Sequence, residues 1–179
     1  TVKRKSGFLT PSFQNSKLLG QAVNIPYFYS ISNSKDLTFK PRIYLDNDFI
    51  MHSEYREAFE NSNLISDFSL NRDEDNSHTH LFAEINGKLD DKTDYDLKIQ
   101  NVSNDNYLKI HDLKQNTKII EDDSSLTSHF KINRNIDKNT NFDGSFKRYE
   151  NLSKTDNDRY QYVFPEFNFS KAIELDPDY

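Results

Sequence analysis

The histidines His78 and His80 are the first residues in this 179-residue chain whose spacing suggests chemistry. On a strand, residues two apart point to the same face, so the pair could supply two ligands of a metal site. No third ligand is evident in the sequence, and same-face polar alternation explains the pair without an ion. We therefore expect no metal site.

Two acidic clusters, residues 73–75 (DED) and 121–123 (EDD), could bind calcium through carboxylate oxygens. Solvated loops explain both clusters more simply. The remaining Asp and Glu residues are too scattered to suggest acid–base catalysis. The sequence also has no cysteine, no glycine-rich phosphate loop and no G-x-S-x-G motif. We therefore predict no catalytic residues, no enzymatic activity and no cofactor.

The composition is unusual for a soluble globular protein. Only 34% of the residues are hydrophobic, yet 13% are aromatic, and the mean hydropathy is -0.90. A sheet with one face in an apolar medium and the other in water would be about half polar. No apolar run approaches 18 residues, which excludes a transmembrane helix but not transmembrane strands of about 9–11 residues. The net charge of -6 disfavours a nucleic-acid partner.

Residues 36–46 alternate with a period of two, which is typical of a strand with one apolar and one polar side. The first side carries Leu37, Phe39, Pro41, Ile43 and Leu45. The second carries Thr38, Lys40, Arg42 and Tyr44. A second strand-like run, residues 20–31, precedes this one across a short polar turn.

Each of these two neighbouring strands contains a proline near its middle, Pro26 and Pro41. Proline cannot donate to a β-ladder and is normally confined to edges, strand starts or bulges. Two prolines in one hairpin predict weakened pairing. Taken alone, they could equally mark bulges or an edge strand.

The same alternation continues along the chain. It predicts strands at residues 20–31, 37–45, 49–59, 63–70, 77–89, 95–102, 124–136, 140–149 and 158–170, with an irregular segment at 103–123. The predicted fold is all-β: an antiparallel meander of about eight or nine long strands that forms a curved, incomplete part of a large outer-membrane β-barrel. Residues 1–19 read as a lead-in, residues 20–170 as the partial barrel, and residues 171–179 as a tail or the start of another strand. The first and last strands are expected to be open edges.

Several stretches resemble a known family. They are residues 4–12 (RKSGFLTPS), 25–29 (IPYFY), 36–42 (DLTFKPR), 54–56 (EYR), 103–108 (SNDNYL) and 160–166 (YQYVFPE). In this order they are similar to the lipopolysaccharide-assembly protein family LptD of the outer membrane of Gram-negative bacteria. The resemblance implies that the lead-in follows a periplasmic domain outside this chain, and that the barrel continues beyond it.

The resemblance also implies a function: insertion of lipopolysaccharide into the outer leaflet through a lumen and a lateral opening. Pro26 and Pro41 match the prolines that loosen the family's lateral gate. The candidates for the polar lumen lining are Lys40, Arg42, His52, Glu54 and Arg56. The implied partners are lipopolysaccharide, outer-membrane lipid, a plug lipoprotein of the LptE type inside the barrel, and periplasmic bridge proteins that act through the missing N-terminal domain.

Two alternatives stay open at the level of sequence. One is a fragment of another outer-membrane barrel, such as a porin or a solute receptor. The other is a soluble β-rich binding module, in which the aromatic alternation would line the inner face of a β-sandwich.

Overall fold

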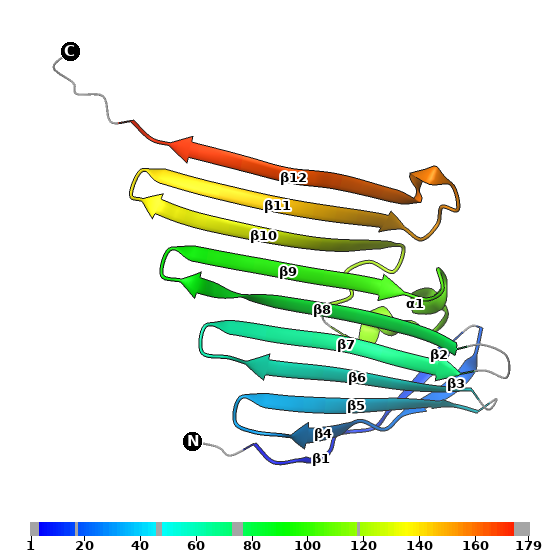
Figure 1. Cartoon of the computed structure of the whole chain (residues 1–179). Helices are drawn as coiled ribbons and strands as arrows, with labels where there is room; N and C mark the ends of the chain where they lie inside the picture. The colour runs from blue at the N-terminus through cyan, green and yellow to red at the C-terminus, as the bar shows by residue number, and fades with distance from the viewer. Residues whose placement is uncertain (1–3, 17, 46–47, 73–76, 118, 174–179) are drawn as a thin grey trace.

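Period-two alternation places most of the chain in strands of one antiparallel sheet (Figure 1). The computed structural model describes residues 4–16, 18–45, 48–72, 77–117 and 119–173, and these form a single 12-stranded sheet. The short strands come first: β1 (Gly7–Phe8), β2 (Ser12–Ser16), β3 (Gly20–Asn24) and β4 (Tyr27–Ser30). The long strands follow: β5 (Lys35–Tyr44), β6 (Phe49–Ala58), β7 (Ser62–Arg72), β8 (Ser77–Asp90), β9 (Thr93–Val102), β10 (Ser125–Asp137), β11 (Thr140–Asn151) and β12 (Tyr160–Lys171).

The predicted meander is confirmed. From β4 to β12 each strand pairs with the next one in the chain, and every pairing is antiparallel. Within the described residues β12 pairs only with β11, so the sheet is open rather than closed. The predicted first strand, residues 20–31, is divided into β3 and β4 at Ile25 and Pro26. Proline removes a ladder donor there, so the division follows from its chemistry.

The connections differ between the two ends of the sheet. At the left end in Figure 1 the strands are joined by short turns, residues 31–34, 59–61, 91–92 and 138–139. At the other end lie the longer connections, residues 103–124 and 152–159. The second of these contains η2 (Asn157–Arg159). Short turns at one end and longer loops at the other are the layout of bacterial outer-membrane barrels.

The expectation that the first strand is an open edge is wrong. Within the lead-in, β1 pairs with β4 and β2 pairs with β3, so residues 7–16 lie along the outer border of the divided first strand. The backbone N–H of Leu9 also donates to the carbonyl of Pro26 over 2.8 Å. The backbone groups of β3 and β4 that point away from β5 therefore bond to the chain's own lead-in. The lead-in supplies the hydrogen-bond partners that a free edge lacks.

The described residues of the segment 103–124, which are 103–117 and 119–124, fold back onto one face of the sheet. They contain α1 (Tyr107–Ile110) and η1 (Leu113–Asn116). No helix among the described residues is both long and apolar enough to cross a membrane. The buried hydrophobic cluster joins this segment to the strands beneath it; its members are Ala22, Tyr44, Ile50, Phe82, Tyr107, Leu108, Leu113, Ile119, Ile120, Leu126 and Leu152.

Candidate functional site

The strand register brings the five predicted lumen residues onto one face of the sheet. Lys40 pairs with His52, Thr38 with Glu54, and Asp36 with Arg56. Because side chains alternate along a strand, Lys40 and Arg42 share this face with His52, Glu54 and Arg56. The rows continue into β7, where Ser69 lies opposite His52 and Asp67 opposite Glu54. We call this surface the polar face.

Ion pairs link neighbouring strands on the polar face. The Lys40 Nζ lies 2.8 Å from Glu54 Oε2. The Arg56 Nε lies 2.9 Å from Oδ1 of Asp36, and the other oxygen of Asp36 accepts from Arg4 at 2.7 Å. The carboxylate of Asp36 is buried, whereas about half of the Arg56 side chain is exposed. Arg56 therefore stays accessible on this face while it neutralises a buried charge.

Arg42 is buried and holds three parts of the chain together. Its Nε donates to Asn24 Oδ1 over 3.0 Å, and its NH1 donates to the hydroxyl of Tyr44 over 3.1 Å. The same NH1 donates to the backbone carbonyl of His111. Arg42 thus joins β3 and β5 to the segment after α1 rather than facing open space.

Residues 103–124 cover the polar face above β7 and β8. The Tyr107 hydroxyl lies 2.7 Å from Ser69 Oγ, and its ring packs edge-on against His111 at 5.0 Å between centroids. Burial raises the pKa of Tyr107 to about 12, against the opposing effect of the Ser69 hydrogen bond. Burial lowers the pKa of His111 to about 4, and the Arg42 guanidinium acts in the same direction.

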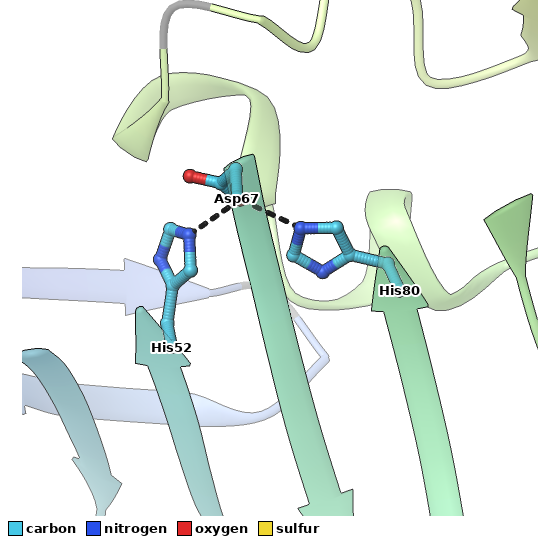
Figure 2. A group of neighbouring side chains, drawn as sticks. All are labelled: His52, Asp67 and His80. Carbon is cyan, nitrogen blue, oxygen red and sulfur yellow. Dashed lines mark hydrogen bonds and ion pairs between the residues drawn. The ribbon is translucent and has the colours of Figure 1, made fainter. Parts of the chain in front are cut away.

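Beneath this cover, the side chains of His52, Asp67 and His80 project from three adjacent strands toward one point (Figure 2). Oδ1 of Asp67 lies 2.8 Å from Nε2 of His52 and 2.6 Å from Nε2 of His80. All three residues are buried. Sequence reasoning paired His80 with His78 and named His52 only as a lumen candidate. It missed Asp67 and the meeting of the three residues, because Asp67 and His52 lie on β7 and β6. Counting the register outward from the short turns could have found them.

The two acidic clusters give no common site. Residues 73–75 lie outside the described part of the chain. In the second cluster, Asp122 accepts from the backbone of Ser124 at 2.8 Å and from the hydroxyl of Ser125 at 2.6 Å. Oε1 of Glu121 lies 3.2 Å from Lys98 Nζ. Turn hydrogen bonds and an ion pair thus account for these carboxylates.

The two prolines interrupt the ladder between the divided first strand and β5. Pairing stops at Asn24–Arg42 and resumes at Tyr27–Phe39. Across the gap the N–H of Ile25 donates to the Pro41 carbonyl over 3.1 Å. The predicted weakening of this hairpin is therefore visible in the register, whereas the role of the prolines in a gate stays a prediction.

The opposite face of the sheet is apolar and exposed, and we call it the apolar face. Direct pairing places Pro41, Met51 and Leu70 in one row of this face, and the rows on either side also carry mostly apolar side chains. Its exposed members include Phe49, Met51, Phe68, Leu70, Leu81, Ile99, Phe130, Phe146, Phe167 and Phe169. A continuous exposed apolar surface of this size marks contact with a membrane or with another protein.

Comparison with known proteins finds several relatives named LPS-assembly protein LptD. The chain is 33% identical over 111 residues to the LPS-assembly protein LptD of Pseudoalteromonas translucida, a stretch that covers 59% of the chain and 15% of that protein. The predicted resemblance to LptD is confirmed. LptD of Idiomarina loihiensis is 29% identical over 110 residues, which cover 59% of the chain and 14% of the relative. LptD of Cupriavidus pinatubonensis is 39% identical over 56 residues, which cover 31% and 7%.

The chain aligns with only a short part of these relatives. The aligned stretches cover at most 15% of these three LptD proteins, so the chain spans only a small part of their length. No family model matches the chain. The name of these relatives connects them with the assembly of lipopolysaccharide (LPS).

Proposed function

We propose that the protein is the opening part of the barrel of an LptD-type lipopolysaccharide-assembly protein in the outer membrane of a Gram-negative bacterium. The observation that carries the proposal is the similarity to LptD in a chain whose sheet has one apolar and one polar face. Residues 20–170 form part of the transmembrane wall. Residues 1–19 lead in from a periplasmic domain, and residues 171–179 form a tail or the start of the next strand.

The two faces have different roles in this proposal. The apolar face meets lipid, because exposed Phe, Leu and Ile side chains stabilise a strand in hydrocarbon and destabilise it in water. The polar face lines the lumen, where Lys40, Glu54 and Arg56 offer charges to the phosphate and sugar groups of lipopolysaccharide. Arg42 and His52 contribute from beneath residues 103–124 by fixing that segment and the strands.

Pro26 and Pro41 form the lateral gate in this proposal. Residues 25 and 26 have no ladder pair with β5, and the gap is bordered by the lead-in. A ladder with fewer hydrogen bonds needs less free energy to open, since each bond contributes about 0.5–1.5 kcal/mol. Acyl chains would leave sideways through the seam between this loosened first strand and the last strand of the complete barrel, while the sugars stay in the lumen.

The transport is not enzymatic and uses no cofactor of its own. Its partners are lipopolysaccharide, outer-membrane lipid, a plug lipoprotein of the LptE type and periplasmic bridge proteins that deliver the cargo. Nucleic acid is not a partner, in keeping with the acidic charge of the chain.

A gate test uses the full-length protein as the only LPS-assembly protein of the cell. The double variant Pro26→Ala/Pro41→Ala restores two backbone donors and should lower the amount of lipopolysaccharide at the cell surface. Pro165→Ala, in β12, is the matched control and should leave it unchanged. A normal amount of surface lipopolysaccharide in a stably expressed double variant would contradict the proposed role of the two prolines in the gate.

A lumen test uses a photo-crosslinking residue at position 54 or position 51. These positions lie on β6 but on opposite faces. The probe at position 54 should capture lipopolysaccharide during transport, and the probe at position 51 should capture bulk membrane lipid. Equal capture at both positions, or solubility of the protein without detergent, would favour a different barrel or a soluble binding module.

A further inference from the structure

We propose that His52, Asp67 and His80 form a binding site for a divalent transition-metal ion, with zinc as the best match. The three side chains come from β6, β7 and β8, and one ligand atom of each lies within 4.8 Å of the other two (Figure 2). Two imidazole nitrogens and one carboxylate oxygen are a common set of protein ligands for zinc. Calcium and magnesium prefer oxygen ligands alone, which argues against them here.

The strongest indication of a missing ligand is the second carboxylate oxygen of Asp67. Asp67 is fully buried, and its Oδ2 has no hydrogen-bond partner among the described residues. A buried carboxylate oxygen without a partner destabilises the fold, because its lost hydration is not replaced. A cation that Asp67 binds through both carboxylate oxygens would offset that cost, and it would be held between strands that are already fixed in register.

The surroundings of His80 are those of a metal ligand. Its Nδ1 lies 2.6 Å from Ser69 Oγ, and Ser69 in turn contacts the Tyr107 hydroxyl at 2.7 Å. When Nε2 binds a metal, the ring proton moves to Nδ1 and is donated to Ser69. A hydrogen-bond acceptor at the second ring nitrogen is the usual partner of a metal-bound histidine, and it fixes the tautomer and the ring.

The geometry needs only a small adjustment. Metal–ligand bonds of about 2.0–2.1 Å in a tetrahedral site separate the ligand atoms by roughly 3.3 Å. The nitrogen–oxygen distances are 2.6 and 2.8 Å, so the side chains would move apart by roughly 0.5–0.7 Å. His52 also lines a cavity of about 500 Å³ between the lead-in and β5, which gives an ion a route to the site.

The bound ion would crosslink β6, β7 and β8 under the segment of residues 103–124. Through Ser69 and Tyr107 it would also stabilise the docking of α1 on the polar face. This role is independent of lipopolysaccharide, so a failure of the metal proposal leaves the proposed transport function untouched.

The test measures metal binding by the whole chain in detergent micelles, dialysed against zinc and then analysed for metal content. We expect one zinc ion per chain, and a cobalt-substituted protein with a visible absorption band of a four- or five-coordinate site. Asp67→Asn and His80→Gln should each abolish stoichiometric binding. Ser69→Ala should weaken binding by about 10-fold or more.

His129→Gln is the matched control. His129 also bonds to an aspartate, with Nε2 2.8 Å from Oδ2 of Asp96, but it lies on β10 away from the cluster. The His129→Gln variant should bind zinc as the unaltered protein does. The proposal is overturned if folded unaltered protein, shown by far-ultraviolet circular dichroism to be rich in strand, binds no zinc. It is equally overturned if His80→Gln binds zinc as tightly; the cluster is then only a hydrogen-bonded triad.

Discussion

Ile25 and Pro41 share one hydrogen bond where an antiparallel pair would make two. The N–H of Ile25 donates to the carbonyl of Pro41 over 3.1 Å, but Pro41 has no N–H to return. The N–H and C=O of a strand residue point to the same side, so the missing donor of Pro41 faces the divided first strand. The carbonyl of Pro26 faces the other way, toward Leu9. The divided first strand therefore lacks one hydrogen-bond donor on each side. Pro41 removes the donor on the β5 side, and Pro26 removes the donor on the side of the lead-in.

Replacement of Pro41 by alanine should close the gap in the ladder. The new N–H would donate to the carbonyl of Ile25 and contribute about 1 kcal/mol to the local stability of the ladder. The amide hydrogen of Ile25 should therefore exchange roughly fivefold more slowly. Hydrogen exchange followed by mass spectrometry of the peptide that contains Ile25 measures this change. Pro165→Ala should leave that peptide unaffected; unchanged exchange in Pro41→Ala would show that the gap has another cause.

The docking of residues 103–124 should weaken in mild acid. The pKa of His111 is lowered to about 4 in the folded protein, whereas its unfolded value is about 6.5. The unfolded segment therefore binds more protons between these values, and the stability present above pH 6.5 is lost as the pH falls toward 4. The carboxyl pKa values of Asp105 and Asp122 are lowered, mainly by hydrogen bonds from Arg159 and Ser125, so these groups titrate below this range.

Limited proteolysis of the segment from pH 7 to pH 4.5 measures this effect. Cleavage within residues 103–124 should rise as the pH falls, and His111→Gln should flatten the profile because glutamine does not titrate. His129→Gln should keep the profile of the unaltered protein. A rise that persists in His111→Gln would assign the effect to a different group.

Gly87 is required by the close approach of the turn at residues 59–61. A Cβ at this position would lie 2.4 Å from the backbone carbonyl oxygen of Asn61. Gly87→Ala should therefore lower the free energy of unfolding by about 1–3 kcal/mol, as overpacking usually does. Gly7→Ala is the control, since a Cβ there meets nothing within 4 Å. Urea unfolding in detergent compares the stabilities of the two variants. Equal unfolding midpoints would show that the turn shifts to accommodate the added Cβ and would contradict the prediction.

A charge on the apolar face should disturb insertion into a membrane. Phe167→Lys places an ammonium group on that face, and Asn168→Lys places one on the polar face of the same strand, β12. A lysine facing lipid costs up to about 4 kcal/mol near the middle of the bilayer. Folding into lipid vesicles should fail or slow for the first variant only; equal effects would contradict the assignment of the faces.

Local pattern was enough to predict most of the fold. Alternation over residues 49–59 predicted β6 (Phe49–Ala58), although this stretch also has helical propensity, because turn signals bracket it. The pairing of the lead-in was missed, since a five-residue strand such as β2 has too few residues to show a period. Polar alternation likewise placed Lys40 and His52 on one face.

The buried cluster could not be predicted in the same way. His52, Asp67 and His80 meet only through the register of three strands, and a shift of one residue would send one of them to the other face. The docking of residues 103–124 had a weak signal, the apolar Leu108, Leu113, Ile119 and Ile120 in a polar stretch. Where this segment docks depends on Ser69 and Arg42, far away in the sequence.

The two borders of the sheet differ chemically, and this difference gives the molecule a direction of growth. One border consists of the short β1 and β2 with Pro11 between them, which is a poor template for another strand. The other is β12, twelve residues long and paired on one side alone within the described part of the chain. New strands, whether from a longer chain or from a second molecule, should therefore add at β12, and elongation of the wall should run one way.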